Sequence, residues 1–149
     1  MATTPAQMDE LIERHLAAEA VGDVDGAIAV YTDDVEHDVV GSPTGVAHGV
    51  DGARAFYEFL TSNIKTETTD ATRTYYSDDA CTVEHLWTGT VPGEFLGIPG
   101  NGRRISFRMI HVFEFRDSLI SRENVWLDGN AIVAQLTAPD LAASATSTT

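Results

Sequence analysis

The sequence predicts an α+β fold in which three N-terminal helices cover a curved antiparallel β-sheet and form a cone with an internal pocket. Residues 5–63 carry mostly helical patterns, and residues 64–128 have the character of strands. The clearest strand, at 105–115, alternates between the two faces and places large apolar residues on one of them: Ile105, Phe107, Met109, Phe113 and Phe115. Helices that precede a run of strands segregate onto one face of the sheet, and a curved sheet covered in this way encloses a pocket suited to a small ligand.

The first helix is predicted to begin at Pro5. Thr4 and Gln7 form a Thr-x-x-Gln capping box, apolar residues then recur at helical spacing, and Gly22 ends the helix. Asp23 caps a second, shorter helix, whose buried side includes Val24, Ala27, Ile28 and Tyr31. A third helix is predicted from about residue 51, with Ala53, Phe56, Tyr57 and Leu60 on its inner face.

Strands are predicted at 35–41, 66–76, 80–90, 104–116 and 120–128, the last two joined by a tight turn. Residues 92–102 hold four glycines and two prolines and predict a long loop. A last helical turn is predicted at 131–136. We therefore expect one domain over residues 5–137, followed by a flexible tail rich in Ala, Ser and Thr over residues 138–149.

The 149 residues include 23 acidic and 9 basic side chains, for a formal net charge of -14. This balance argues against nucleic acid and against anionic membranes, which both require Lys and Arg patches. No signal peptide or membrane-spanning run is recognisable, and the single cysteine, Cys81, suits a reducing compartment, so we expect a cytoplasmic protein. Without a P-loop, GxGxxG, CxxC or HExxH motif, we expect no cofactor and no metal.

Four ionisable residues occupy apolar faces: His15 on the first helix, His85 and His111 on strands, and Asp38 on the strand at 35–41. A single histidine of this kind is more often a hydrogen-bonded core residue than a functional one. Each buried polar group without a partner costs about 1–3 kcal/mol, however, and a domain is stable by only roughly 5–15 kcal/mol. The simplest hypothesis is that the four converge on one polar pocket.

The chain resembles ketosteroid isomerases and, more broadly, the nuclear-transport-factor-2-like superfamily with its SnoaL-type polyketide cyclases. The N-terminal half carries the similarity in LIERHLAAEAVGDVDG at 11–26, YTDD at 31–34, DVVG at 38–41, Gly49 and AFY at 55–57. The C-terminal half is more similar to the cyclases, in GIPGNGRR at 97–104, HVFEFRD at 111–117 and WLD at 126–128. The resemblance covers most of residues 6–137 and implies the fold more strongly than the reaction.

The resemblance implies that Asp38 matches the catalytic base of the isomerases, His15 their oxyanion-hole tyrosine, and His111 their protonated aspartic acid. Two of these three residues are of a different type, which argues against the same steroid chemistry. The acidic base that the cyclases carry on their last strand falls at Val125. Limonene-type epoxide hydrolases need an Asp-Arg-Asp set, which would fall at Val125, His85 and Trp87, so that reaction is disfavoured.

The sequence and the resemblance together suggest a cofactor-independent isomerase, cyclase or lyase that transfers protons on a hydrophobic carbonyl compound. Asp38 is the expected general base, and His15 and His111 are the expected oxyanion donors. The expected substrate-binding residues are His85, Trp87, Tyr31, Phe56, Phe107, Phe113 and Val125. A ligand carrier without chemistry and a purely structural dimerisation domain remain alternatives, and a homodimer is expected in each case.

Overall fold

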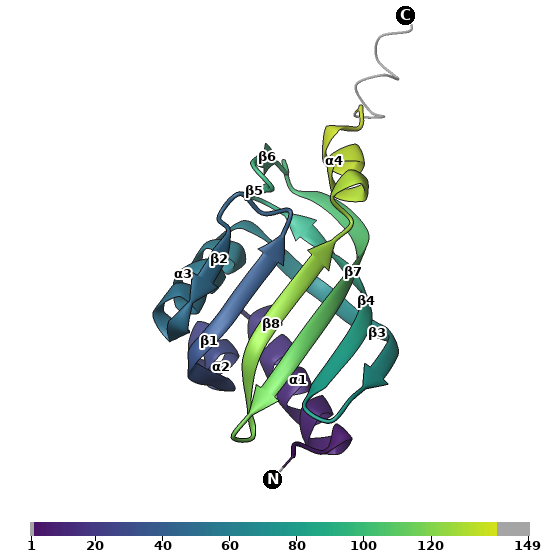
Figure 1. Ribbon diagram of the computed structural model, residues 1–149. Helices are drawn as coiled ribbons and strands as arrows, with labels where there is room; N and C mark the ends of the chain where they lie inside the picture. The colour runs from purple at the N-terminus through teal and green to yellow at the C-terminus, as the bar shows by residue number, and fades with distance from the viewer. Residues whose placement is uncertain (1, 140–149) are drawn as a thin grey trace, which may run out of the picture.

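The computed structural model describes residues 2–139, which form four helices, a six-stranded sheet and a small two-stranded hairpin (Figure 1). In chain order the elements are α1 (Pro5–Ala20), α2 (Val24–Ile28), β1 (Tyr31–Val40), β2 (Val46–His48), α3 (Gly49–Asn63), β3 (Lys65–Tyr76), β4 (Ala80–Val91), β5 (Glu94–Phe95), β6 (Ile98–Pro99), β7 (Arg103–Arg116), β8 (Leu119–Leu127) and α4 (Gly129–Thr137). Residues 140–149, most of the predicted tail, lie outside the described residues.

The predicted α+β architecture is confirmed, because α1, α2 and α3 lie together on one face of a curved, unclosed sheet (Figure 1). The capping box at the start of α1 is formed: the Thr4 side chain accepts from the Gln7 backbone N–H, and the Gln7 side chain accepts from that of Thr4. Asp23 likewise caps α2 by accepting from the Gly26 N–H. Local sequence signals therefore determine where the first two helices begin.

The sheet has the strand order β2-β1-β8-β7-β4-β3, and one pairing differs from the prediction. The pair β1 and β8 is parallel, whereas the other pairs in this sheet are antiparallel, so the sheet is mixed. β1 begins at Tyr31 rather than at residue 35 as predicted, so Tyr31 belongs to this strand and not to the second helix, which ends at Ile28. The register of β1 with β8 shifts between Tyr31 and Glu36. The predicted loop at 92–102 contains the short hairpin of β5 and β6.

The concave face of the sheet carries two buried apolar clusters. One packs α1, α2 and α3 against the sheet and includes Met8, Phe113 and Ile120. The other surrounds Trp87 and also contains Phe107 and residues of α4. Among residues 2–139, no helix is long and apolar enough to cross a membrane.

Candidate active site

A cavity of about 290 Å³ lies between the helices and the concave face of the sheet. Its walls are mainly apolar and come from α1, α3, β1, β4, β7, β8 and the segment at 94–97. The polar side chains that reach it from α1, α3 and the sheet include Glu19, His37, Tyr57, His111 and Glu123. A concave apolar site with a few convergent polar groups is the usual form of a small-molecule site.

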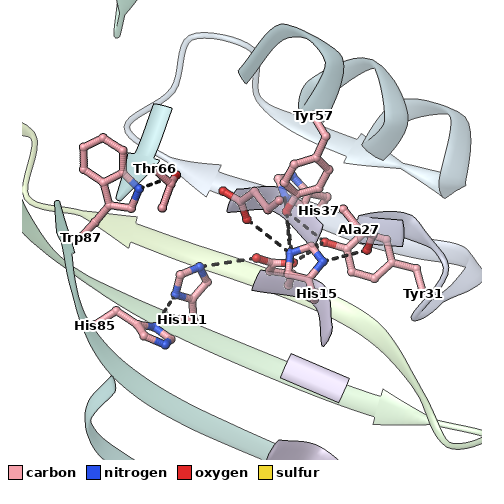
Figure 2. A network of polar contacts seen from close by, with 11 residues as sticks. His15, Ala27, Tyr31, His37, Tyr57, Thr66, His85, Trp87 and His111 are labelled. Carbon is pink, nitrogen blue, oxygen red and sulfur yellow. Dashed lines mark hydrogen bonds and ion pairs between the residues drawn. The ribbon is translucent and has the colours of Figure 1, made fainter. Parts of the chain in front are cut away.

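Glu123, on β8, is the centre of the polar cluster and is only 1% exposed. Its Oε2 accepts a hydrogen bond from the Tyr31 hydroxyl and a longer one, of 3.4 Å, from the Tyr57 hydroxyl. The same oxygen lies 3.2 Å from Nε2 of His15, and Oε1 lies 3.4 Å from Nε2 of His111 (Figure 2). Burial alone would raise the pKa of Glu123, but these histidines outweigh burial and hold the pKa well below its usual range, so the carboxylate is ionised.

His15 supplies the positive charge that balances Glu123. Its Nδ1–H donates to the Ala27 carbonyl oxygen at 2.8 Å, which fixes the ring so that Nε2 faces the carboxylate. Burial alone would lower the pKa of His15, but the charge of Glu123 and the hydrogen bond to it raise the pKa to about 9. At neutral pH, His15 and Glu123 therefore form a buried ion pair.

The Tyr57 hydroxyl joins α3 to this pair. It lies 3.0 Å from Nε2 of His15, 3.0 Å from Nε2 of His37 and 3.1 Å from the Tyr31 hydroxyl (Figure 2). Burial and the charge of Glu123 raise the pKa of Tyr57 well above 10, so the hydroxyl keeps its proton. Burial lowers the pKa of His37, which is therefore neutral at pH 7.

His111 and His85 continue the network across the sheet, with their Nδ1 atoms 2.9 Å apart. Burial lowers the pKa of His111 to about 3 and that of His85 to about 4, so both rings are neutral. A neutral imidazole has one N–H, and because Nε2 of His111 faces the ionised Glu123, we place the proton of His111 on that nitrogen, where it donates to the carboxylate. His85 then donates from Nδ1 to Nδ1 of His111.

Glu19 lies one helical turn after His15 and is a second carboxylate of the cavity. Its Oε2 lies 3.7 Å from Nε2 of His15, and its side chain is 18% exposed. Burial, with a smaller contribution from the charge of Glu123, raises the pKa of Glu19 to about 7 against the opposing effect of His15. Two carboxylates in one cavity thus have widely separated acidities, an arrangement typical of acid/base sites.

Five of the ten predicted site residues line the cavity: His111, Trp87, Phe56, Phe107 and Val125. His15 and Tyr31 are buried behind Glu123, and His85 lies behind His111. Phe113 is a fully buried core residue whose ring stacks against that of His111, with centroids 5.2 Å apart.

Asp38 does not join the site, so its predicted place in the pocket is wrong. Successive side chains of a strand point to opposite faces, and between residues 35 and 40 of β1 the buried positions are Val35, His37 and Val39. Asp38 points to the other face, where it accepts a hydrogen bond from Asn124 at 3.2 Å. His37, its immediate neighbour in the chain, takes the inward position.

The sequence analysis missed Glu19, His37, Tyr57 and Glu123 as site residues, and the spacing of two of them relates them to residues that it did identify. Glu19 follows His15 by four residues and shares its helical face. Glu123 precedes Val125 by two residues and therefore shares its face of β8, so this face of the last strand does carry an acidic group. Within residues 2–139, no group of three or more His, Cys, Asp or Glu side chains is arranged to hold a metal ion.

Comparison with known proteins defines the class of protein. The family model described as SnoaL-like polyketide cyclase matches residues 10–136, so the chain belongs to that family, and the resemblance seen in the sequence is confirmed. No curated protein matches the chain.

Solved structures of several proteins have the same fold as this chain. TsrD from Streptomyces laurentii is 26% identical, with a TM-score of 0.78 over 91% of this chain and 98% of its own. A proposed polyketide cyclase from Silicibacter is 25% identical, with a TM-score of 0.77 over 88% and 96% of the two chains. A Catenulispora acidiphila protein with a ketosteroid isomerase-like fold, in complex with trimethylamine, is 17% identical, with a TM-score of 0.73 over 92% and 96%, and shows the fold alone.

Proposed function

We propose that the cavity is the active site of a cofactor-independent enzyme that moves protons on a hydrophobic carbonyl compound, in an isomerisation or a cyclisation. The observation that carries this proposal is the ionised Glu123, held by His15, His111 and two tyrosines at the polar end of an apolar cavity. Hydroxyl and imidazole donors held in place around this carboxylate can stabilise negative charge that develops during a reaction, because water is excluded and the donors need not reorient. Membership in the polyketide cyclase family supports the same class of chemistry.

The geometry also supports a role for the neutral donors of the cavity. Removal of a proton next to a carbonyl leaves negative charge on the carbonyl oxygen, which needs hydrogen-bond donors. Tyr57 and His37 line the cavity, and the Tyr57 hydroxyl keeps its proton at any physiological pH. These residues take over the donor roles that the sequence analysis gave to His15 and His111, because His15 is the counter-ion of Glu123 and His111 donates to it. The Tyr57 hydroxyl, 3.4 Å from Glu123, can turn to the substrate instead.

The walls of the cavity support a hydrophobic substrate. Trp87, Phe107 and Phe56 are among the aromatic rings that line the cavity, and no Lys or Arg of the described residues does so. An anionic substrate would find no fixed positive partner other than His15, which is already paired with Glu123. The cavity is near the lower end of the roughly 300–1,000 Å³ usual for ligand sites, so the substrate is a compact hydrophobic molecule.

We further propose that the protein is a cytoplasmic homodimer. The convex face of the sheet exposes Leu86, Ile110 and Trp126 on the neighbouring strands β4, β7 and β8. Adjacent large apolar side chains on a surface are typical of an interaction site. Light scattering is expected to give the mass of two chains for the unchanged protein. For Trp126→Glu, it is expected to give the mass of one chain.

The activity is tested with β-tetralone, a compact apolar ketone with acidic α-protons. NMR in D₂O would follow replacement of those protons by deuterium with and without the protein. The matched variants are Val125→Phe, which fills the cavity, and Val133→Phe, which changes an exposed position on α4. We expect exchange with the unchanged protein and with Val133→Phe only. Binding of the ketone without exchange would instead favour the ligand carrier.

A further inference from the structure

We infer that Glu19 is the group that takes and returns the substrate proton, while Glu123 acts as a fixed charge. This inference rests on the proposed function and assigns roles to the two carboxylates at the polar end of the cavity. Three observations support it: the carboxylate oxygens of Glu123 already have partners, the Glu19 carboxylate reaches the cavity without a hydrogen bond, and the groups around Glu19 allow it to change protonation state.

Glu123 has little capacity left to accept a proton. Its Oε2 is approached by the hydroxyls of Tyr31 and Tyr57 and by Nε2 of His15, and its Oε1 faces Nε2 of His111. Hydrogen bonds and a positive charge that favour the ionised form of a carboxylate make it a weak base. A substrate proton that moved to Glu123 would also leave the buried His15 cation without its counter-ion.

Glu19 differs in each of these respects. Its side chain lines the cavity and is part-exposed, and among residues 2–139 its carboxylate makes no hydrogen bond. Its nearest charged neighbour, Nε2 of His15, is 3.7 Å from Oε2, beyond hydrogen-bond length. A third carboxylate that lines the cavity, Glu94, lies at an exposed position on β5, away from the buried cluster. Glu19 is therefore the carboxylate beside the cluster that has free lone pairs for a substrate C–H.

The surroundings of Glu19 leave it able to change protonation state near neutral pH. The ionisable groups of the cluster come from α1 (His15), β1 (Tyr31, His37), α3 (Tyr57), β7 (His111) and β8 (Glu123). Of these, His15 favours the charged form of Glu19, whereas burial and Glu123 disfavour it, and the resulting pKa is about 7. A general base is most effective when its pKa is close to the working pH.

The proton transfer balances without a co-reactant. The α-carbon C–H bond of the substrate breaks, an O–H bond forms on the Glu19 carboxylate, and the C–H electron pair moves into the carbonyl to give an enolate. The Tyr57 hydroxyl gives up its long, 3.4 Å hydrogen bond to Glu123 and donates to the enolate oxygen. Glu19 then returns the proton to carbon, at the same or a conjugated position. In a cyclisation, the enolate carbon instead attacks a second carbonyl to close a ring, and Glu19 gives its proton to the alkoxide that forms.

The test is the pH profile of β-tetralone exchange in D₂O between pH 5 and 9 with the full chain. With the unchanged protein, we expect the rate to rise as Glu19 ionises, with a midpoint near pH 7. Glu19→Gln should slow exchange by roughly 100-fold or more and remove this rise, because an amide cannot take the proton. Glu13→Gln, at an exposed position on the same helix, is the matched control and should leave the profile unchanged.

Two further measurements distinguish loss of the base from loss of the fold. Glu19→Gln should bind β-tetralone as the unchanged protein does, which shows that it is folded, and Glu19→Asp should recover part of the rate together with the pH dependence. If Glu19→Gln retains the rate and the profile, the role of Glu19 is overturned while the proposed function stands. If the unchanged protein exchanges no protons, the proposed function fails, and the inference fails with it.

Discussion

Replacement of Glu123 by glutamine is the perturbation that most strongly tests the polar cluster. The amide has the same size as the carboxylate but carries no charge, so His15 loses the group that raises its pKa to about 9. If His15 then gives up its proton at pH 7, the loss corresponds to roughly 3 kcal/mol, since one pKa unit is 1.36 kcal/mol. The amide N–H₂ must also face hydroxyl and imidazole donors, and an unsatisfied buried group costs about 1–3 kcal/mol.

We therefore expect Glu123→Gln to lower the free energy of unfolding by about 3–5 kcal/mol, the usual cost of breaking a buried ion pair from one side. The measurement is urea unfolding at pH 7, followed by fluorescence and circular dichroism. Glu114→Gln is the matched control, because Glu114 pairs with Arg122 at 3.1 Å in a part-exposed position on β7. Pairs of that kind contribute only about 0–1 kcal/mol.

The reasoning would be refuted if Glu123→Gln destabilised the protein no more than Glu114→Gln does. That result would mean that Glu123 is already protonated in the folded protein, or that water enters the cluster and replaces its partners. Stability of the order of 5–15 kcal/mol leaves room to measure a loss of this size without complete unfolding.

Three further predictions follow from the same network. The pKa of His15 rises from 6.5 to about 9 on folding, so its stabilisation of the fold is complete below pH 6.5 and is lost as the pH rises through 9. The urea midpoint should fall over this range, and the fall should be smaller in His15→Gln. Tyr57→Phe removes the hydroxyl that bridges His15 and His37, so we expect a loss of about 1–3 kcal/mol in urea unfolding together with slower ketone exchange. Asp38→Asn should leave exchange of β-tetralone unchanged, since Asp38 faces away from the cavity, and a large drop in rate would restore it as a candidate base.

The fold was largely predictable because most of its determinants are local. The Thr4 and Gln7 capping box and the alternation along β7 depend on neighbouring residues, and both are present in the structure. The parallel pairing of β1 with β8 joins segments that are far apart in the chain, so no local pattern reveals it. The early start of β1 was missed because Asp33 and Asp34 are exposed strand residues that resemble a turn.

The site was only partly predictable for a related reason. His15 and His111 stand out because each interrupts an apolar face, whereas Glu123 lies between the polar residues Arg122 and Asn124 and interrupts nothing. Asp38 is expected in the pocket from the sequence because it lies beside valines and matches the base of the isomerases, but the register of β1 turns His37 inward instead. A shift of one residue along a strand reverses which neighbour faces the pocket. The role of Glu19 depends on the distance between α1 and β8, which only the three-dimensional structure supplies.

The central claim is that a charged His15 and an ionised Glu123 form a buried pair beside neutral histidines. Nitrogen-15 NMR of histidine-labelled protein at pH 7 tests it directly, because the ring nitrogen shifts distinguish the cation from each neutral tautomer. We predict that His15 carries protons on both nitrogens and that His111 and His85 are neutral. A neutral His15, or a charged His111, would contradict the account.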